Sequence, residues 1–217
     1  MQDLYKHKGL RKKLVETIKN KGIKDEKVLA AMEKIPRHYF MDSSFLEYAY
    51  QDKPFPIGAG QTISQPFTVA FMTELLDIKK GDKIMEIGTG SGYQSCMLAE
   101  LGAKVYSIER QKSLFKKNEH ILNELGYFIK AFYGDGYLGL PTYAPFDKII
   151  VTAGAPYIPE PLKQQLKNGG ILVIPVGKGS TQIMTKITKI SQDEYQVKEF
   201  GTFAFVPLLI DKEDKKN

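Results

Sequence analysis

Alternating glycines that directly follow a short apolar run offer the first chemistry in this sequence. Residues 83–87 read as a buried strand, Gly88, Gly90 and Gly92 follow at every second position, and residues 93–101 read as a helix. A strand, a glycine turn and a helix N-terminus in this order form a cradle for a nucleotide-type cofactor, because backbone without side chains lets a ligand approach closely. We predict cofactor contacts along this turn, at Glu86, Gly88, Thr89, Gly90, Ser91 and Gly92.

The spacing of these glycines differs from the dinucleotide fingerprint G-x-G-x-x-G. Tyr93 stands where that pattern has its third glycine, the additional glycine comes earlier at Gly92, and the acid Glu86 precedes the first glycine by two residues. This departs from a pyrophosphate cradle, in which the third glycine permits close packing of the helix. The turn therefore fits a smaller ligand with one nucleoside and no phosphates. A glycine-rich turn without a ligand is the plainer alternative.

A second acid ends the next predicted strand. Residues 104–108 alternate as a strand does, and Glu109 follows Gly88 by about 20 residues, the separation at which an acid accepts hydrogen bonds from ribose hydroxyls. Glu109 could instead be a charge at the N-terminus of the helix that begins near Gln111. Joined to the glycine turn, Glu109 and the adjacent Arg110 indicate S-adenosylmethionine or a nicotinamide cofactor, and the glycine spacing favours the former.

A further candidate group follows a later strand. Gly134, Asp135 and Gly136 come directly after the predicted strand 127–133. Ligands of open parallel sheets bind beyond the carboxyl ends of the strands, so we predict that these three residues contact the cofactor, with Asp135 accepting from the exocyclic amine of adenine. An Asx turn between two glycines is the alternative for Asp135.

The elements that must position these residues alternate regularly. Strands and helices alternate after residue 79, which predicts an α/β fold with a parallel sheet, and the last two strands, 182–190 and 195–205, follow each other without a helix and predict an antiparallel hairpin. Three helices are predicted before this core, at 4–20, 25–34 and 68–76. We predict a single domain over residues 1–210, followed by a charged tail (211–217). The domain is divided into residues 1–78, which hold the N-terminal helices and an acceptor loop formed by the irregular segment 36–66, and the sheet core (79–210).

Residues 36–66 follow neither a helical nor a strand period. They contain Pro54, Pro56, Gly58 and Gly60 and end in Gln61-Thr62-Ile63-Ser64-Gln65-Pro66. A long irregular segment in a compact domain is usually functional. The alternative for Ser64 is a turn serine or an N-cap of the following helix, a position that Thr68 could also fill.

Composition excludes several classes of protein. The chain has 217 residues, of which 42% are hydrophobic, and no apolar run approaches the length of a membrane span or a secretory leader. The single cysteine, Cys96, excludes an internal disulfide, and the three histidines have no metal-ligand spacing. We therefore predict a cytoplasmic protein without a metal or a membrane partner. The net charge of +6 could indicate nucleic acid, but the lysines are scattered among acids, which favours solvated helix faces.

With these residues in hand, the chain resembles the protein-L-isoaspartate O-methyltransferases over about residues 28–208. The cofactor motif, residues 86–94, is shared by many methyltransferases, so the specific matches are those outside it. These are Pro36-Arg37-His38, Gly60-Gln61-Thr62-Ile63-Ser64-Gln65-Pro66, Gly134-Asp135-Gly136, Phe146-Asp147-Lys148-Ile149-Ile150-Val151-Thr152-Ala153 and Phe205-Val206-Pro207-Leu208.

The resemblance implies a Rossmann-like methyltransferase fold: a seven-stranded, mostly parallel sheet with an antiparallel last strand, helices on both faces and an N-terminal helical extension. It implies S-adenosyl-L-methionine as cofactor, with S-adenosyl-L-homocysteine as product, and methylation of isoaspartyl residues in flexible segments of damaged proteins and peptides, which starts their repair. It also implies Ser64 as the catalytic residue, in a substrate-binding set of Gln61, Thr62, Ile63, Ser64, Gln65, Pro66 and Val206. Ala204 and Leu140 depart from the arginine and tryptophan of many bacterial relatives, which puts side contacts to the peptide in question.

Two other readings remain open. A methyltransferase that acts on nucleic acid or a small molecule would share the cofactor motif, although base methylases usually carry Asn/Asp-Pro-Pro-aromatic where this chain has Thr152-Ala153-Gly154-Ala155-Pro156. A non-catalytic nucleoside-binding or NAD-binding protein is the third reading.

Methylation of a carboxylate needs no general base, because the α-carboxyl group, with a pKa of about 3.5, is already ionised at neutral pH.

Overall fold

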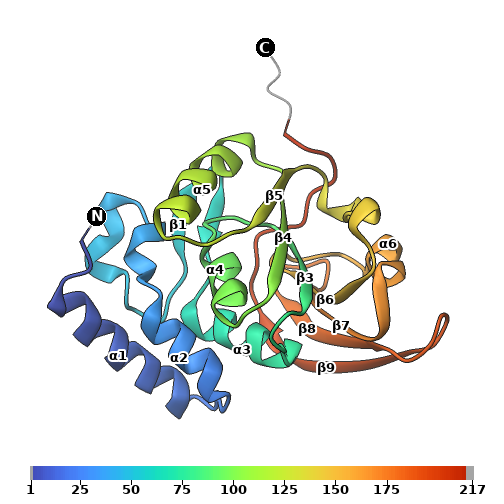
Figure 1. Cartoon of the computed structure of the whole chain (residues 1–217), viewed down its shortest axis with the longest axis horizontal. Helices are drawn as coiled ribbons and strands as arrows, with labels where there is room; N and C mark the ends of the chain where they lie inside the picture. Colours follow the sequence, from blue (N-terminus) through green and yellow to red (C-terminus); the bar gives the residue numbers. More distant parts are fainter. Residues whose placement is uncertain (1, 214–217) are drawn as a thin grey trace.

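A seven-stranded sheet, in the order β5-β4-β3-β6-β7-β8-β9, runs through the molecule (Figure 1). The structure is a computed structural model, and it describes residues 2–213. The strands are β3 Lys83–Ile87, β4 Lys104–Glu109, β5 Lys130–Tyr133, β6 Phe146–Val151, β7 Leu166–Val176, β8 Gln182–Lys189 and β9 Tyr195–Phe203. The first five are parallel, β8 runs antiparallel to β7, and the last strand, β9, runs antiparallel to β8. This confirms the predicted sheet and its C-terminal hairpin.

Helices cover both faces of the sheet because successive strand residues point to opposite sides. On β3, Ile84 packs with Leu76 of α3, whereas the next residue, Met85, packs with Leu162 of α6 on the other face. The helices are α1 Tyr5–Asn20, α2 Glu26–Lys34, α3 Pro66–Leu76, α4 Tyr93–Glu100, α5 Lys112–Glu124 and α6 Glu160–Gln164, with 3₁₀ turns at η1 Arg37–Phe40, η2 Ser43–Tyr48, η3 Gly136–Leu138 and η4 Pro141–Tyr143. No helix within residues 2–213 is both long and apolar enough to cross a membrane.

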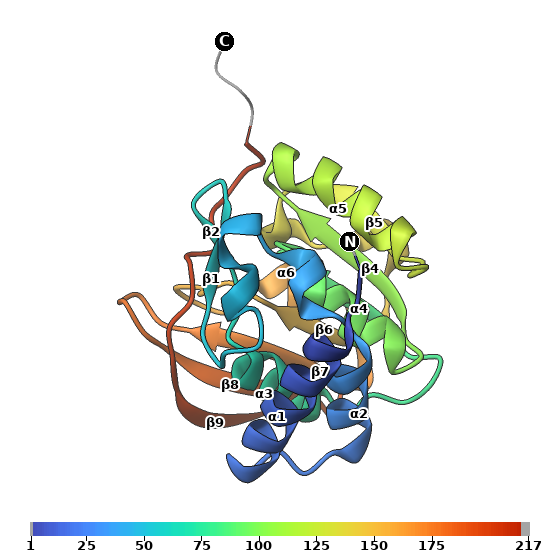
Figure 2. The ribbon, with the colours of Figure 1, turned by 90° about the vertical axis from the view of Figure 1, so that its left-hand side faces the viewer.

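The N-terminal helices form a layer beside α3 and α4, and α1 and α2 lie side by side in both views (Figures 1 and 2). Helix α2 begins as predicted, because Asp25 Oδ1 accepts from the Lys27 amide at 2.8 Å and the Val28 amide at 3.4 Å. Leu14 and Ile18 of α1 are buried in a core that also holds residues of α4 and α5. This packing joins the N-terminal layer to the glycine turn, which begins α4.

The segment predicted to be irregular, 36–66, holds more structure than its sequence indicates. It contains η1, η2 and a two-stranded antiparallel hairpin, β1 Phe55–Gly58 and β2 Gln61–Ile63, closed at Gly58, Ala59 and Gly60, which all have positive φ. Elements of three to six residues are too short to produce a recognisable period, which is why the pattern missed them.

Two element boundaries differ from the prediction for local reasons. The strand expected at 127–133 begins only at Lys130, because the Tyr127 amide still closes the end of α5 by donating to the Leu122 carbonyl at 2.9 Å. Helix α3 begins at Pro66, two residues early, with Gln65 as N-cap and no side-chain cap from Gln65. Neither Ser64 nor Thr68 caps this helix, so the N-cap alternative for Ser64 is wrong.

Candidate active site

A cavity of about 850 Å³, its open mouth included, lies at the carboxyl ends of β3, β4 and β6. This is where ligands of open parallel sheets bind. The residues that line it come from the glycine turn, the ends of three strands, the hairpin β1–β2 and the C-terminal segment. They are Gln61, Thr62, Ile63, Ser64, Val69, Met72, Ile87, Gly88, Thr89, Gly90, Ser91, Tyr93, Gln94, Ile108, Glu109, Arg110, Gly136, Thr152, Ala153, Val206, Pro207, Leu208 and Leu209.

The glycine turn presents bare backbone to this cavity. Gly88, Gly90 and Gly92 have φ of +91°, +54° and +87°, values that side chains rarely allow. A Cβ on Gly88 would lie 2.7 Å from Thr152 Oγ1, whose hydroxyl donates to the Gly88 carbonyl at 2.6 Å. The turn therefore fits a ligand that approaches the main chain closely, although Gly92 itself does not line the cavity and instead begins α4.

Glu109 lies at the cavity wall, where the ribose interpretation requires an acid. Its side chain is only 4% exposed, and its oxygens accept from the Gly90 amide at 2.8 Å and the Gln111 amide at 2.7 Å. Burial raises the pKa of Glu109, against the opposing effect of these amides. A carboxylate has about four acceptor sites, so Glu109 can hold the glycine turn and still accept from a ligand. Because Gln111 is the N-cap residue of α5, Glu109 also binds the N-terminal end of that helix.

Glu86, predicted to contact the cofactor, lies behind the glycine turn and does not line the cavity. It is fully buried, and its Oε2 accepts from Ser95 of α4 and, at 2.6 Å, from Ser107 of β4. Burial raises the pKa of Glu86 to about 7, although both hydroxyls oppose this. Ser107 also hydrogen-bonds to Thr89 at 2.6 Å, so Glu86 supports the turn from below.

The Gly134-Asp135-Gly136 group is only partly at the cavity. Gly136 lines it, and a Cβ there would collide with Ile87, whereas Gly134 and Asp135 do not line it. Asp135 accepts from the Tyr137 amide at 2.8 Å, the Asx geometry, and from the Asp211 amide at 3.0 Å. Arg110 holds the same C-terminal segment, donating from Nε to the Asp211 carbonyl at 2.9 Å.

A second cavity meets the first at the acceptor loop. Its lining residues come from the acceptor loop, the start of α3 and the segment after β9. They are Pro54, Thr62, Ser64, Gln65, Phe67, Thr68, Thr152, Gly201, Thr202, Phe203, Ala204, Phe205 and Val206. Thr62, Ser64, Thr152 and Val206 line both cavities. We call the first the cofactor cavity and the second the acceptor groove.

Ser64 is therefore placed at the junction of the two cavities. Its hydroxyl has no hydrogen-bond partner among residues 2–213, and its carbonyl accepts from Arg37 Nη2 at 3.1 Å. Of the other predicted acceptor residues, Gln61 and Ile63 face the cofactor cavity and Gln65 the groove, whereas Pro66 is buried at the start of α3 and lines neither.

Two residues that the sequence analysis did not select as site residues hold the acceptor loop. Arg37 is fully buried and donates to the carbonyls of Ala49, Lys53 and Ser64 at 2.6, 3.1 and 3.1 Å. Burial lowers the pKa of Arg37 to about 10, so it keeps its charge at neutral pH. The signal in the sequence was Pro36-Arg37-His38, but nothing in it tells which carbonyls the arginine reaches.

Asp52 is the second. Its Oδ1 accepts from the Phe67 amide at 2.8 Å and its Oδ2 from Gln65 Nε2 at 3.1 Å, so it replaces the missing side-chain cap of α3. Lys21 pairs with it at 2.6 Å. Asp52 thereby connects the acceptor loop to the end of α1 and the start of α3. These residues are too far apart in the sequence for the contacts to be predicted from it.

The two positions that depart from bacterial relatives have different surroundings. Ala204 lines the acceptor groove, so its small side chain widens the wall where a peptide would lie. Leu140 lines neither cavity; it packs with the core of the α6 face, and its amide donates to Gln165 Oε1 at 2.7 Å.

Comparison with known proteins gives consistent relatives. The family model described as Protein-L-isoaspartate(D-aspartate) O-methyltransferase (PCMT) matches residues 9–214. The Protein-L-isoaspartate O-methyltransferase of Christiangramia forsetii is 62% identical over 213 residues, covering 98% of this chain and 100% of that protein. The one of Dictyoglomus turgidum is 50% identical over 207 residues, covering 95% and 94%.

Solved structures agree with this. A protein-L-isoaspartate O-methyltransferase superposes with a TM-score of 0.82 at 28% identity and covers 91% of this chain and 65% of its own, so this chain spans about two thirds of that structure's length. A protein-L-isoaspartate O-methyltransferase from Plasmodium falciparum, in complex with S-adenosyl-L-homocysteine, has a TM-score of 0.81 at 27% identity and covers 92% and 98%. The chain belongs to the protein-L-isoaspartate(D-aspartate) O-methyltransferase family.

Proposed function

We propose that this protein transfers a methyl group from S-adenosyl-L-methionine to the α-carboxylate of L-isoaspartyl residues in proteins and peptides. One observation carries the proposal beyond family membership: the cofactor cavity and the acceptor groove meet at Ser64. A transfer between two bound molecules requires such a junction, whereas a protein that only stores a nucleoside needs one cavity.

The cofactor cavity fits S-adenosylmethionine by the chemistry of its wall. The glycine turn gives close approach to the main chain, Glu109 supplies an acceptor for ribose hydroxyls, and Gly136 leaves space that a side chain would fill. Glu86 and Gly92 support the turn, and Asp135 and Arg110 hold the C-terminal segment at Asp211. The Gly134 amide donates to the Glu109 carbonyl at 3.0 Å. S-adenosylmethionine supplies a methyl group on a positively charged sulfur and leaves as S-adenosylhomocysteine.

The acceptor groove receives the peptide. We assign the Ser64 hydroxyl as donor to one carboxylate oxygen, because it has no other partner within residues 2–213. The Val206 carbonyl is held by the Gly154 amide at 2.8 Å, which leaves the Val206 amide to donate to the other oxygen. Gln61, Thr62, Ile63 and Gln65 shape the passage, and Pro66 anchors it. The isoaspartyl residue must enter the junction, so we expect flexible segments as substrates.

The reaction needs orientation more than acid–base chemistry. The acceptor carboxylate is ionised at neutral pH, with a pKa of about 3.5 in the free group, so its oxygen attacks without a base. A new O–CH₃ bond forms while the C–S bond breaks, and the bonding electrons remain on sulfur. Holding the three atoms in line contributes about 7–11 kcal/mol in favourable intramolecular cases. The backbone amide nitrogen that follows then attacks the ester, loses its proton and displaces methanol, which forms a succinimide. Water reopens the succinimide, partly to normal aspartate, which is the repair.

A labelled-methyl assay tests the proposal directly. The enzyme is given S-adenosylmethionine with two peptides of one sequence, one isoaspartyl and one aspartyl, and separately with total RNA, DNA and a mixture of small metabolites. We expect label in the isoaspartyl peptide alone, and Ser64→Ala is the control that should lower it. Label in RNA, DNA or metabolites without label in the peptide would overturn the proposal in favour of the alternative methyltransferase. Tight NAD binding without S-adenosylhomocysteine binding in calorimetry would exclude both.

The cysteine content bears on the compartment in which the protein works. The one cysteine, Cys96, is a buried free thiol, and burial raises its pKa. We propose that the enzyme works in the cytoplasm on protein substrates and has no nucleic-acid or membrane partner.

A further inference from the structure

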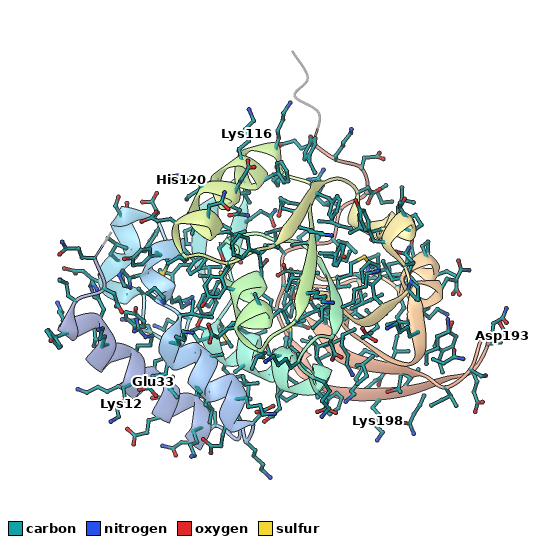
Figure 3. The ribbon with its side chains drawn as sticks, viewed as in Figure 1. Lys12, Glu33, Lys116, His120, Asp193 and Lys198 are labelled. Carbon is teal, nitrogen blue, oxygen red and sulfur yellow. The ribbon has the colours of Figure 1, made fainter. Side chains whose placement is uncertain are left out.

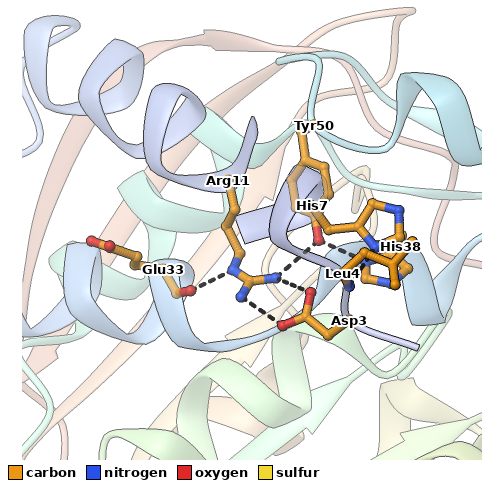
Figure 4. A network of polar contacts seen from close by, with 7 residues as sticks. All are labelled: Asp3, Leu4, His7, Arg11, Glu33, His38 and Tyr50. Carbon is orange, nitrogen blue, oxygen red and sulfur yellow. Dashed lines mark hydrogen bonds and ion pairs between the residues drawn. The ribbon is translucent and has the colours of Figure 1, made fainter. Parts of the chain in front are cut away.

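The fold brings His38 of η1 close to two side chains at the start of the chain, Asp3 and His7 (Figure 4). One ligand atom of each lies within 4.8 Å of the others. The rings of His7 and His38 are 4.0 Å apart between centroids and tilted by 43°. This group, which we call the N-terminal cluster, lies outside both the cofactor cavity and the acceptor groove.

His38 has the arrangement of a metal ligand. It is 1% exposed, and its Nδ1 hydrogen-bonds to the Tyr50 hydroxyl at 2.6 Å. Its buried Nε2 makes no hydrogen bond of good geometry with a described residue, although the Gln2 backbone lies close enough to favour the protonated ring and raise the pKa of His38 against the effect of burial. Metal-binding histidines typically use one ring nitrogen for the ion and the other for a hydrogen bond that fixes the ring. A buried nitrogen without a good partner is unfavourable, so a ligand there removes an unfavourable feature of the core.

Asp3 is held in place in the same way. Arg11 donates from its two terminal nitrogens to Asp3 Oδ1 and Oδ2, at 3.1 and 3.0 Å, and also donates to the Tyr50 hydroxyl at 3.0 Å. The guanidinium uses two of about four acceptor sites on the carboxylate, so Asp3 keeps lone pairs for an ion. Arg11 and Tyr50 thus hold Asp3 and His38 from behind, although the positive charge of Arg11 weakens the attraction for a cation.

His7 completes the group and needs only a small movement. Its Nδ1 accepts a long hydrogen bond, 3.3 Å, from the Leu4 amide, which an ion could replace. Ligands at about 2.1 Å from a tetrahedral ion lie about 3.4 Å apart. The cluster must therefore close from at most 4.8 Å by up to about 1.4 Å, and Asp3 and His7 are both half-buried, so they have room to do so.

We propose that Asp3, His7 and His38 form a structural binding site for a divalent transition-metal ion, with Zn²⁺ as the physiological candidate. This departs from the sequence prediction of a protein without a metal, and the methyl transfer itself does not depend on the ion. Two imidazole nitrogens and one carboxylate suit zinc and its neighbours, whereas Mg²⁺ and Ca²⁺ prefer oxygen ligands alone. The ion would join the start of α1 to η1. His38 adjoins Arg37, which holds the Ser64 carbonyl, so the site would brace the acceptor loop from the N-terminal side.

Calorimetry with Zn²⁺ and absorption spectroscopy with Co²⁺ test this on the full chain without an added histidine tag. The variants are His7→Ala and Asp3→Asn, whose side chains are half-buried and whose loss should leave the fold intact, as circular dichroism checks. The matched control is His120→Ala, because His120 is an exposed histidine on α5 that projects outward from the molecule (Figure 3).

We expect the wild-type protein and His120→Ala to bind one Zn²⁺ per chain with a raised melting temperature, and to show Co²⁺ absorption bands of nitrogen ligation. Both cluster variants should bind at least about tenfold more weakly and lose the thermal shift. Absence of Zn²⁺ binding to the wild type, equal affinity in His7→Ala, or loss of binding in His120→Ala would each overturn the proposal.

Discussion

At the scale of single residues, the side chain of Ser64 lies at the junction of the cofactor cavity and the acceptor groove. It lines both cavities, it caps no helix, and no residue within 2–213 hydrogen-bonds to its hydroxyl. The absence of a capping bond excludes the helix-capping role that its position in the sequence left open. We therefore keep the proposal that its hydroxyl donates to the acceptor carboxylate.

We therefore predict that Ser64→Ala lowers the rate of methyl transfer by about one to three orders of magnitude, as when one oriented donor at a reacting oxygen is removed. Single-turnover transfer to an isoaspartyl peptide measures this, and calorimetry should find unchanged cofactor affinity. The remaining rate should stay level from about pH 6 to 8, because the nucleophile is already ionised. A lowered melting temperature with normal turnover would remove Ser64 from the site.

Glu109 serves the fold and the cofactor together. We predict that Glu109→Ala weakens binding of S-adenosylhomocysteine at least about tenfold, because a charge-assisted acceptor is worth about 1.5–3 kcal/mol. Glu109→Gln, which keeps an acceptor but not the charge, should give a smaller loss. Calorimetry on both variants measures the difference. Unchanged affinity in the alanine variant would leave Glu109 as a helix-end charge that only binds the Gly90 and Gln111 amides.

At the scale of elements, the acceptor loop is positioned from inside the protein. Arg37 reaches three carbonyls of the segment 49–64 with one planar group, and the Ala49 carbonyl belongs to a fully buried residue. Lysine carries the same charge but lacks the fork of donors, so the two residues are not equivalent here. The loop's shape therefore depends on guanidinium geometry and not on charge alone.

We predict that Arg37→Lys lowers the free energy of unfolding by about 1–3 kcal/mol and the methyl-transfer rate by about tenfold, because a displacement of about 1 Å at Ser64 disturbs alignment. Cofactor affinity should change little, since Arg37 does not line the cofactor cavity. Urea unfolding, single-turnover kinetics and calorimetry separate the three effects. Equal loss of cofactor binding and transfer would instead indicate general unfolding.

At the scale of the whole molecule, one buried carboxyl group links the two elements around the glycine turn. Glu86 of β3 accepts from α4 and β4, and burial raises its pKa from 4.5 to about 7. The folded state therefore keeps this proton to a higher pH than the unfolded chain does. Its contribution to stability is full below about pH 4.5 and is lost as the pH rises through about 7.

We predict that Glu86→Gln, which stays neutral, gains stability relative to the wild type between pH 5 and 8.5, by about 3 kcal/mol at most from 1.36 kcal/mol per pKa unit. Urea unfolding of both proteins across that range measures the difference between their free energies of unfolding. The contributions of the other titrating groups cancel in this difference. A difference that is flat with pH would show that Glu86 is already ionised in the folded protein at pH 5.

The sequence by itself determined the parts of this protein that depend on local pattern. The glycine turn, Glu109, the alternating strands and helices, and the C-terminal hairpin all follow from periodicity and backbone freedom within short stretches. The family resemblance added the acceptor loop, and the comparisons confirmed the family. Boundaries were less certain, because residues such as Tyr127 can close one element before another begins.

Only the tertiary structure decided what happens between distant residues. It turned Glu86 away from the cavity, gave Asp135 an Asx turn and a contact to Asp211, and placed Arg37 under Ser64. It also brought His7 beside His38, two histidines whose spacing indicates no site. The physical reason is common to all four: hydrogen-bond partners and burial depend on packing between elements, which no local period records.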